Sequence, residues 1–163
     1  MPGAELLAAW SMAGISEAAR NAKGDKHGQG PCHHQTALYV DDFDRARTFY
    51  QDVFGLKPPL EQDGFCAYDV AGRSVLLIFA RGQFLNTQKR PGGEIPPHDG
   101  SGPAHVAFAI DAQALEEWKA RLCDFGIGVE GRMQWARVGR SLFFRDPENH
   151  LLELMTPGNW TTY

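Results

Sequence analysis

The pattern of apolar and polar residues runs through the same series twice between residues 33 and 158. Each series opens on a short β-rich run, first Gln35–Val40 and later His105–Ile110. Apolar residues then recur every three or four positions, which predicts an amphipathic helix in each series. Gly55 is expected to end the first helix and Gly126 the second, because glycine readily takes the left-handed conformation of a helix C-cap.

Strand-like runs follow each predicted helix. The first series continues with Gly64–Val70 and Ser74–Ala80, which an Ala-Gly turn separates. The second continues with Gly128–Glu130, Ser141–Arg145 and Leu151–Met155. The stretch between the two series is dense in Gly and Pro and predicts a long irregular loop.

The two series match position by position. Gln35 and His105 hold equivalent places at an offset of 70 residues, and aspartates that can cap a helix follow both strands: Asp41 or Asp42, and Asp111. A chance likeness does not account for strand, cap, helix and terminal glycine recurring in order. A repeat of this length is a whole supersecondary unit, and two such units are expected to pack around one concave surface. We therefore predict an α+β fold of two βαβββ modules that form an open, cup-shaped mixed sheet.

The predicted organisation has four parts. Residues 32–90 form the first module, 91–103 the Gly- and Pro-rich loop, and 104–163 the second module with its tail. Residues 1–31 form an N-terminal helix and a polar, glycine-rich linker. The helix carries an apolar stripe that includes Trp10. Two interpretations stay open: a poorly ordered extension, or an arm that packs on a neighbouring subunit.

Composition and charge narrow the classes of function. The 163 residues carry a formal net charge of −4, so no basic face for nucleic acid is expected. No apolar run approaches the roughly 20 residues of a membrane span, and the first residues make a poor secretory signal. The three cysteines are scattered, which argues against a disulfide framework or a cysteine-rich zinc site and predicts a cytoplasmic protein.

Three polar residues mark a candidate metal site. Gln35 and His105 stand at matching strand starts, and Glu153 lies in an otherwise apolar strand, where a carboxylate is costly to bury unless it is paired or bound to a cation. Each has an ordinary alternative: a polar strand residue, a satisfied core histidine and a carboxylate on a solvated edge. Taken together at symmetry-related positions, they favour a site.

The sequence resembles the glyoxalase, bleomycin resistance and extradiol dioxygenase superfamily, also called vicinal oxygen chelate. The resemblance covers about residues 33–158 and is carried by the segments 35–46, Phe49-Tyr50, Phe54–Leu56, His105–Ile110 and 144–154. It implies two βαβββ modules around one divalent metal ion. Each module would supply one ligand from the start of its first strand and one carboxylate or histidine from its last strand.

Carried over to this sequence, the resemblance makes Gln35, His105 and Glu153 the metal ligands, with Glu153 also catalytic. The ion would be Zn, Mn, Fe(II) or Ni, among which the sequence does not choose. The fourth family ligand falls among three residues that cannot coordinate a metal, namely Leu76, Leu77 and Ile78. This departure argues against the four-ligand site of the glyoxalase lyases.

His98, in the long loop, is a candidate for proton transfer, with a solvated loop histidine as the alternative. The favoured function is a metal-dependent lyase, dioxygenase or thiol transferase that acts on a small oxygen-rich molecule. One alternative is a bleomycin-resistance-like protein that binds a drug without catalysis, and another is a regulatory or structural dimer with a degenerate site. The resemblance also implies a homodimer, while the charge balance and the lack of a long apolar run predict neither nucleic acid nor a membrane as a partner.

Overall fold

The computed structural model describes residues 32–161 of the chain. The predicted N-terminal helix with Trp10 lies outside the described residues. The chain divides into two units, residues 1–32 and 33–163, and the second unit holds both repeated series.

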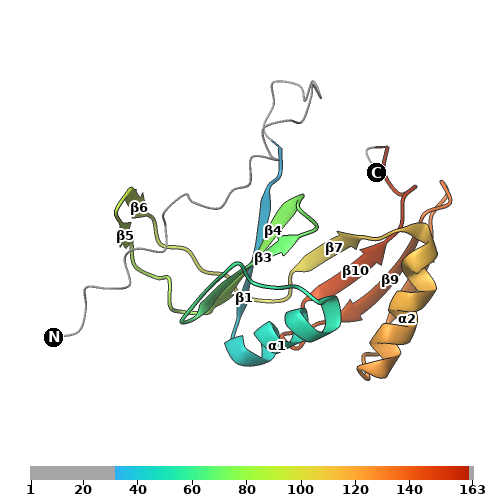
Figure 1. Cartoon of the computed structure of the whole chain (residues 1–163), viewed down its shortest axis with the longest axis horizontal. Helices are drawn as coiled ribbons and strands as arrows, with labels where there is room; N and C mark the ends of the chain where they lie inside the picture. The colour runs from blue at the N-terminus through green and yellow to red at the C-terminus, as the bar shows by residue number, and fades with distance from the viewer. Residues whose placement is uncertain (1–31, 162–163) are drawn as a thin grey trace. The chain divides into compact units, whose positions relative to one another are not determined.

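The first series folds into one four-stranded mixed sheet with a helix (Figure 1). Its elements are β1 (Gln35–Val40), α1 (Phe43–Phe54), β2 (Leu60–Gln62), β3 (Phe65–Val70) and β4 (Ser74–Ala80). The strands lie in the order β1-β4-β3-β2, with β1 parallel to β4 and the other pairs antiparallel.

The second series repeats this topology. Its elements are β7 (His105–Ala109), the short 3₁₀ helix η2 (Ala112–Ala114), α2 (Leu115–Asp124), β8 (Gly131–Gln134), β9 (Arg140–Arg145) and β10 (Leu151–Met155). The strand order β7-β10-β9-β8 matches the first sheet element for element, with β7 parallel to β10. The predicted α+β fold of two βαβββ modules is therefore confirmed.

The ends of α1 follow from local chemistry. The Asp42 side chain accepts a hydrogen bond from the backbone N–H of Arg45 at 3.0 Å, so Asp42, not Asp41, is the cap. Gly55 ends the helix at φ 67°, a left-handed conformation that costs glycine little. Asp111 precedes η2 without a side-chain capping bond, and α2 starts only after that turn.

Each sheet has one face in the core and one open face. In β1, Leu38 and Val40 are buried, whereas the alternate residues Gln35 and Ala37 are exposed. The core joins both sheets and both helices, and it includes Tyr50 of α1. Alternation thus places Gln35 on the open face of its sheet and His105, the matching residue, on the open face of the other.

Two expectations about strands are corrected. The run Gly128–Glu130 is irregular, and the strand β8 begins at Gly131, because the hairpin turn pairs Gln134 with Arg140 and thereby sets the register. The long loop also contains a small hairpin, β5 (Gln88–Arg90) and β6 (Gly93–Ile95). Figure 1 shows this hairpin standing apart from both four-stranded sheets.

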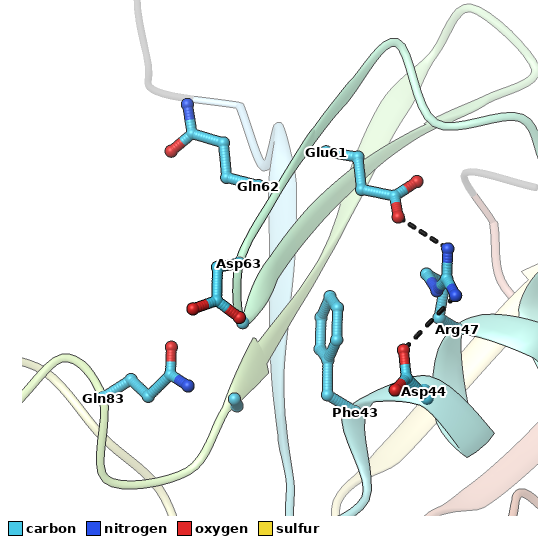
Figure 2. Close-up of a pocket in the computed structure, with 9 residues that line it drawn as sticks. Phe43, Asp44, Arg47, Glu61, Gln62, Asp63 and Gln83 are labelled. Carbon is cyan, nitrogen blue, oxygen red and sulfur yellow. Dashed lines mark hydrogen bonds and ion pairs between the residues drawn. The ribbon is translucent and has the colours of Figure 1, made fainter. Parts of the chain in front are cut away.

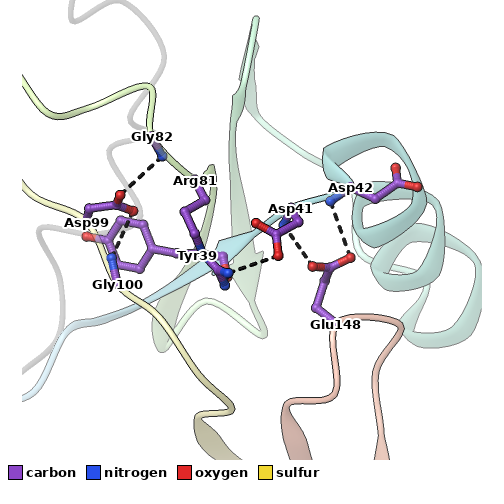
Figure 3. A network of polar contacts seen from close by, with 8 residues as sticks. All are labelled: Tyr39, Asp41, Asp42, Arg81, Gly82, Asp99, Gly100 and Glu148. Atoms are coloured by element: carbon purple, nitrogen blue, oxygen red, sulfur yellow. Dashed lines mark hydrogen bonds and ion pairs between the residues drawn. The ribbon is translucent and has the colours of Figure 1, made fainter.

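The turn before β10 links the two modules. Glu148 accepts backbone hydrogen bonds from Asp41 at 2.7 Å and Asp42 at 3.3 Å, at the start of α1 (Figure 3). The buried carboxylate of Asp146 accepts the Tyr50 hydroxyl of α1 at 2.8 Å. Burial raises the pKa of Asp146, while the hydrogen bonds from Tyr50 and from the backbone N–H groups of His150 and Glu148 oppose the rise. The turn therefore fixes β10 against the first module.

Candidate metal centre on the open sheet face

His105 and Glu153 meet on the open face of the second sheet. Glu153 on β10 is the Cα partner of Ala107, two residues after His105 on the same face of β7. The two side chains approach to 3.2 Å between His105 Nε2 and Glu153 Oε2. The Glu153 side chain is only 8% exposed, and that of His105 is 51% exposed. The Glu153 carboxylate is thus shielded from solvent on this face, whereas the His105 ring reaches solvent.

The second oxygen of Glu153 is left without a partner. Oε1 is buried and makes no hydrogen bond within the described part of the chain. A buried carboxylate oxygen without a donor is costly, and a cation offsets this cost. The donor set of imidazole and carboxylate therefore fits a divalent metal ion.

The strand register identifies the fourth family position. Glu153 pairs with Ala107 in the second sheet, and the equivalent pair in the first sheet joins Leu77 to Ala37. Leu77 is half-buried on the same open face as Gln35. Of the three candidates in the sequence, Leu77 is thus the equivalent of Glu153, and its side chain cannot bind a metal.

Gln35 lies on the other sheet from the His105–Glu153 pair, and its side chain is exposed. Among the described residues, no three His, Cys, Asp or Glu side chains gather into a metal-binding set. A site made only of these residue types is therefore not formed within residues 32–161. In a three-ligand site built on His105 and Glu153, the third ligand would be a residue of another type, such as Gln35, or would come from another molecule.

A pocket of about 350 Å³ adjoins His105. It lies between the start of β1, the β3–β4 turn and β7, and the residues that line it include His33, Thr36, Arg73, Leu76, Val106 and Phe108. His33 Nε2 lies 3.0 Å from Thr36 Oγ1. Apolar side chains line the pocket together with imidazole and guanidinium groups, and its volume is large enough for a small molecule.

His98 occupies a fixed place on the open face of the first sheet. Its Nδ1 lies 2.8 Å from the Tyr39 hydroxyl, and its ring stacks on Phe84 and meets Phe79 edge-on. Burial, and secondarily Asp99, raises the pKa of Tyr39, so this hydroxyl keeps its proton at neutral pH. The Tyr39 hydroxyl and His98 Nδ1 share one hydrogen bond, and in the tautomer in which the hydroxyl donates, the ring proton lies on Nε2.

The base of the His98 loop is tied to β1 by polar contacts. Asp99 accepts backbone hydrogen bonds from Gly82 and Gly100, and Arg81 forms an ion pair with Asp41 at 2.9 Å (Figure 3). The backbone of Gly100 packs so closely on the Tyr39 ring that an added Cβ would come within 2.6 Å of it. These contacts hold the His98 ring against the sheet.

A larger groove of about 580 Å³ lies at the start of α1, away from the candidate ligands (Figure 2). Arg47 crosses it and bonds the carboxylates of Asp44 and Glu61. The remaining lining residues include Phe43, Asp63 and Gln83. The ion pairs of Arg47 with Asp44 and Glu61 lie at the surface, where such pairs contribute little.

The sequence did not predict the hydrogen-bond partners of His98 and His150. The contact of Tyr39 with His98 spans 59 positions, and that of Ala104 with His150 spans 46. Neither follows from local spacing. The only signal was the turn Asp146-Pro-Glu-Asn149, which predicts a tight connection but not the residues it would reach.

The two mixed sheets and the His105–Glu153 pair define a class: α+β proteins of paired βαβββ modules with a candidate metal centre on an open sheet face. The chain belongs to the Glyoxalase/Bleomycin resistance protein/Dioxygenase superfamily, whose family model matches residues 33–154. The resemblance inferred from the sequence is thereby confirmed.

Known proteins of this family resemble the chain over most of its length. Metallothiol transferase FosB of Staphylococcus saprophyticus is 32% identical over 119 residues, which are 72% of this chain and 71% of that protein. Fosfomycin resistance protein FosX of Listeria innocua is 26% identical over 120 residues, 72% and 83% of the two chains. The crystal structure of lactoylglutathione lyase from Agrobacterium tumefaciens matches with a TM-score of 0.73 and 32% identity, over 82% of this chain and 99% of that one. Within the described residues, no helix is long and apolar enough to cross a membrane.

Proposed function

We propose that this protein is a metal-dependent enzyme that acts on a small oxygen-rich molecule. The supporting observation is the buried Glu153 carboxylate, which meets His105 with one oxygen and leaves the other without a partner. In this proposal both residues bind one divalent ion, and Gln35 adds its amide oxygen as the third ligand. When bound, the ion would act as a Lewis acid toward two adjacent oxygens of the substrate.

In this proposal Gln35 reaches the pair from a second copy of the chain. Gln35 and the His105–Glu153 pair lie on the open faces of different sheets. A two-fold dimer can set the first sheet of one copy over the second sheet of the other, and each of its two sites would then contain all three ligands. A homodimer would also cover sheet edges that are otherwise unpaired.

The reaction class we propose is thiol transfer. It is supported by the curated relatives named metallothiol transferase and by Leu77, which removes the fourth ligand of a glyoxalase lyase. The thiol sulfur would bond to a substrate carbon as a carbon–oxygen bond breaks, and the thiol proton would end on the released oxygen. His98 is hydrogen-bonded to Tyr39, and Tyr39 lies four residues along β1 from Gln35, a separation of about 13 Å between the two residues. At this distance from the metal ligands, His98 would move a proton at the thiol or at the remote end of the substrate.

The test is thiol consumption by the purified protein. Fosfomycin, named in the FosX relative, is supplied with glutathione or cysteine and with Zn, Mn, Fe(II) or Ni in turn. We expect thiol loss that requires a divalent ion and that Glu153→Gln abolishes. No thiol loss with any ion would contradict thiol transfer for this substrate. Metal-independent binding of a small molecule without turnover would favour the drug-binding alternative.

A second candidate function is a lactoylglutathione lyase, which the A. tumefaciens structure supports by its 32% identity. Leu77 opposes it, because the fourth ligand position then carries no carboxylate that could move protons. We expect weak or absent turnover of the methylglyoxal–glutathione adduct. Robust turnover that Glu153→Ala abolishes would replace thiol transfer by the lyase reaction.

A further inference from the structure

His150 lies at the junction between the two strands that carry the candidate ligands. It is 2% exposed and stands directly before β10, three residues ahead of Glu153. Its ring nitrogen Nδ1 accepts a hydrogen bond from the backbone N–H of Ala104 at 2.9 Å. Ala104 in turn is the residue before His105. One imidazole therefore connects the chain beside one ligand to the chain beside the other.

The peptide groups on both sides of Ala104 are held by this junction. Its N–H donates to the His150 ring, and its carbonyl accepts the N–H of Leu151 at 2.8 Å. Leu151 is the Cα partner of His105, and Glu153 follows two residues later on the same face. The position of Ala104 thus sets where β7 starts against β10. A small displacement there would change the 3.2 Å approach of His105 to Glu153.

The His150 backbone is fixed independently of its ring. Asp146 Oδ1 accepts the His150 N–H at 2.8 Å, while Asp146 Oδ2 accepts the Tyr50 hydroxyl. The other ring nitrogen, Nε2, is buried and has no hydrogen-bond partner within the described residues. An apolar side chain would avoid the cost of burying this nitrogen, but it would leave the Ala104 N–H without an acceptor. The contribution of the ring at this place is therefore its acceptor at Nδ1.

We propose that His150 is a positioning residue for the metal centre: its Nδ1 holds Ala104 and thereby aligns His105 with Glu153. The proposal rests on the proposed function, in which these two side chains bind the ion. Residues that orient metal ligands typically change metal affinity about 10- to 100-fold when replaced. His150 would act in this way through the backbone, without touching the ion.

The test compares two replacements of His150 by cobalt(II) titration of the metal-free protein, followed by visible absorption. In His150→Asn the amide oxygen can take the place of Nδ1, so affinity and spectrum should stay close to those of the parent. In His150→Leu no acceptor remains, so affinity should fall about tenfold or more and the spectrum should change. If the leucine variant does not fold, His150→Phe, which keeps a ring without an acceptor, replaces it.

Tyr50→Phe is the matched control, because it removes a hydrogen bond to the same turn while leaving the Ala104 contact in place. It should lower the melting temperature but not the cobalt affinity. Equal cobalt affinity in the parent, His150→Leu and His150→Asn would overturn the proposal, and so would an equal loss in His150→Leu and Tyr50→Phe.

A second measurement needs no metal. The His105 and Phe143 rings lie 6.2 Å apart between centroids, so proton NMR should show cross-relaxation between them in the metal-free parent. This signal should persist in His150→Asn and weaken in His150→Leu. If the parent binds no cobalt, the proposed metal centre fails, and the ring signal alone decides whether His150 aligns β7 with β10. An unchanged signal in His150→Leu would then refute the alignment.

Discussion

Gln35 is the weakest of the three proposed metal ligands. An amide oxygen is neutral and binds transition metals more weakly than imidazole does. We predict that Gln35→His tightens divalent-metal binding severalfold. Isothermal titration of the metal-free protein would measure the change. Ala37→His is the control, because Ala37 lies on the same open face two residues further along β1. An equal gain in both variants, or no gain in Gln35→His, would place Gln35 outside the metal site.

That His105 and Glu153 belong to one site was expected from the repeat and the family resemblance, whereas their shared sheet face depends on the pairing of β7 with β10, which alternation within one strand does not specify. The fourth position remained among three residues until the register singled out Leu77. The environments of His98 and His150 could not be predicted. Both depend on contacts across about 50 residues, which arise from tertiary packing and leave no local pattern.

The helix α1 and the turn before β10 are joined by the Tyr50 hydroxyl and the buried Asp146 carboxylate. We predict that Tyr50→Phe lowers the free energy of unfolding by about 1–3 kcal/mol at neutral pH, because an acceptor is left without its buried donor. The loss should be smaller at acid pH. The lost hydrogen bond lowers the Asp146 pKa in the parent, so its removal raises the folded-state pKa further above the unfolded value. The variant therefore loses more stability as pH rises through that range.

Urea unfolding of the parent and Tyr50→Phe at several pH values would measure this. Phe49→Leu, on the same helix but without a buried hydroxyl, provides a control for lost packing. A penalty for Tyr50→Phe that is the same at acid and neutral pH would show that the hydroxyl does not support the ionised form of Asp146.

Helices and strands differed in how well the sequence predicted them. The limits of α1 were predictable because Asp42 and Gly55 act within one turn of the helix. β8 was misplaced because its limits depend on pairing with β9, and a hairpin turn four residues later sets that register. The hairpin β5–β6 was missed because each of its strands has only three residues, too few for a pattern to emerge.

The whole molecule is predicted to be a homodimer in which each metal site combines two chains. Mixing Gln35→Leu with Glu153→Gln tests this directly. A mixed dimer would contain one site with both changes and one site with none. Mixing should therefore restore metal binding at one of the two sites of each mixed dimer. If each chain builds its own site, mixing restores nothing. A monomer in sedimentation at micromolar concentration would also contradict the dimer.

The role of residues 1–31 can be tested by the oligomeric state of a shortened chain. A chain that begins at Cys32 should remain dimeric if the sheet faces and edges form the contact. Loss of the dimer would instead assign the contact to the N-terminal segment with its apolar stripe.

The central claim is that His105 and Glu153 form a divalent-metal centre, and Glu153→Gln tests it most directly. Glutamine keeps the size of the side chain and removes the buried charge, so the metal-free variant should be at least as stable as the parent. Calorimetric titration of metal-free protein with zinc should show one ion per chain in the parent and at least tenfold weaker binding in Glu153→Gln. Equal zinc affinity of the two proteins would contradict the claim. It would also be contradicted if the parent bound none of Zn, Mn, Fe(II) and Ni in separate titrations.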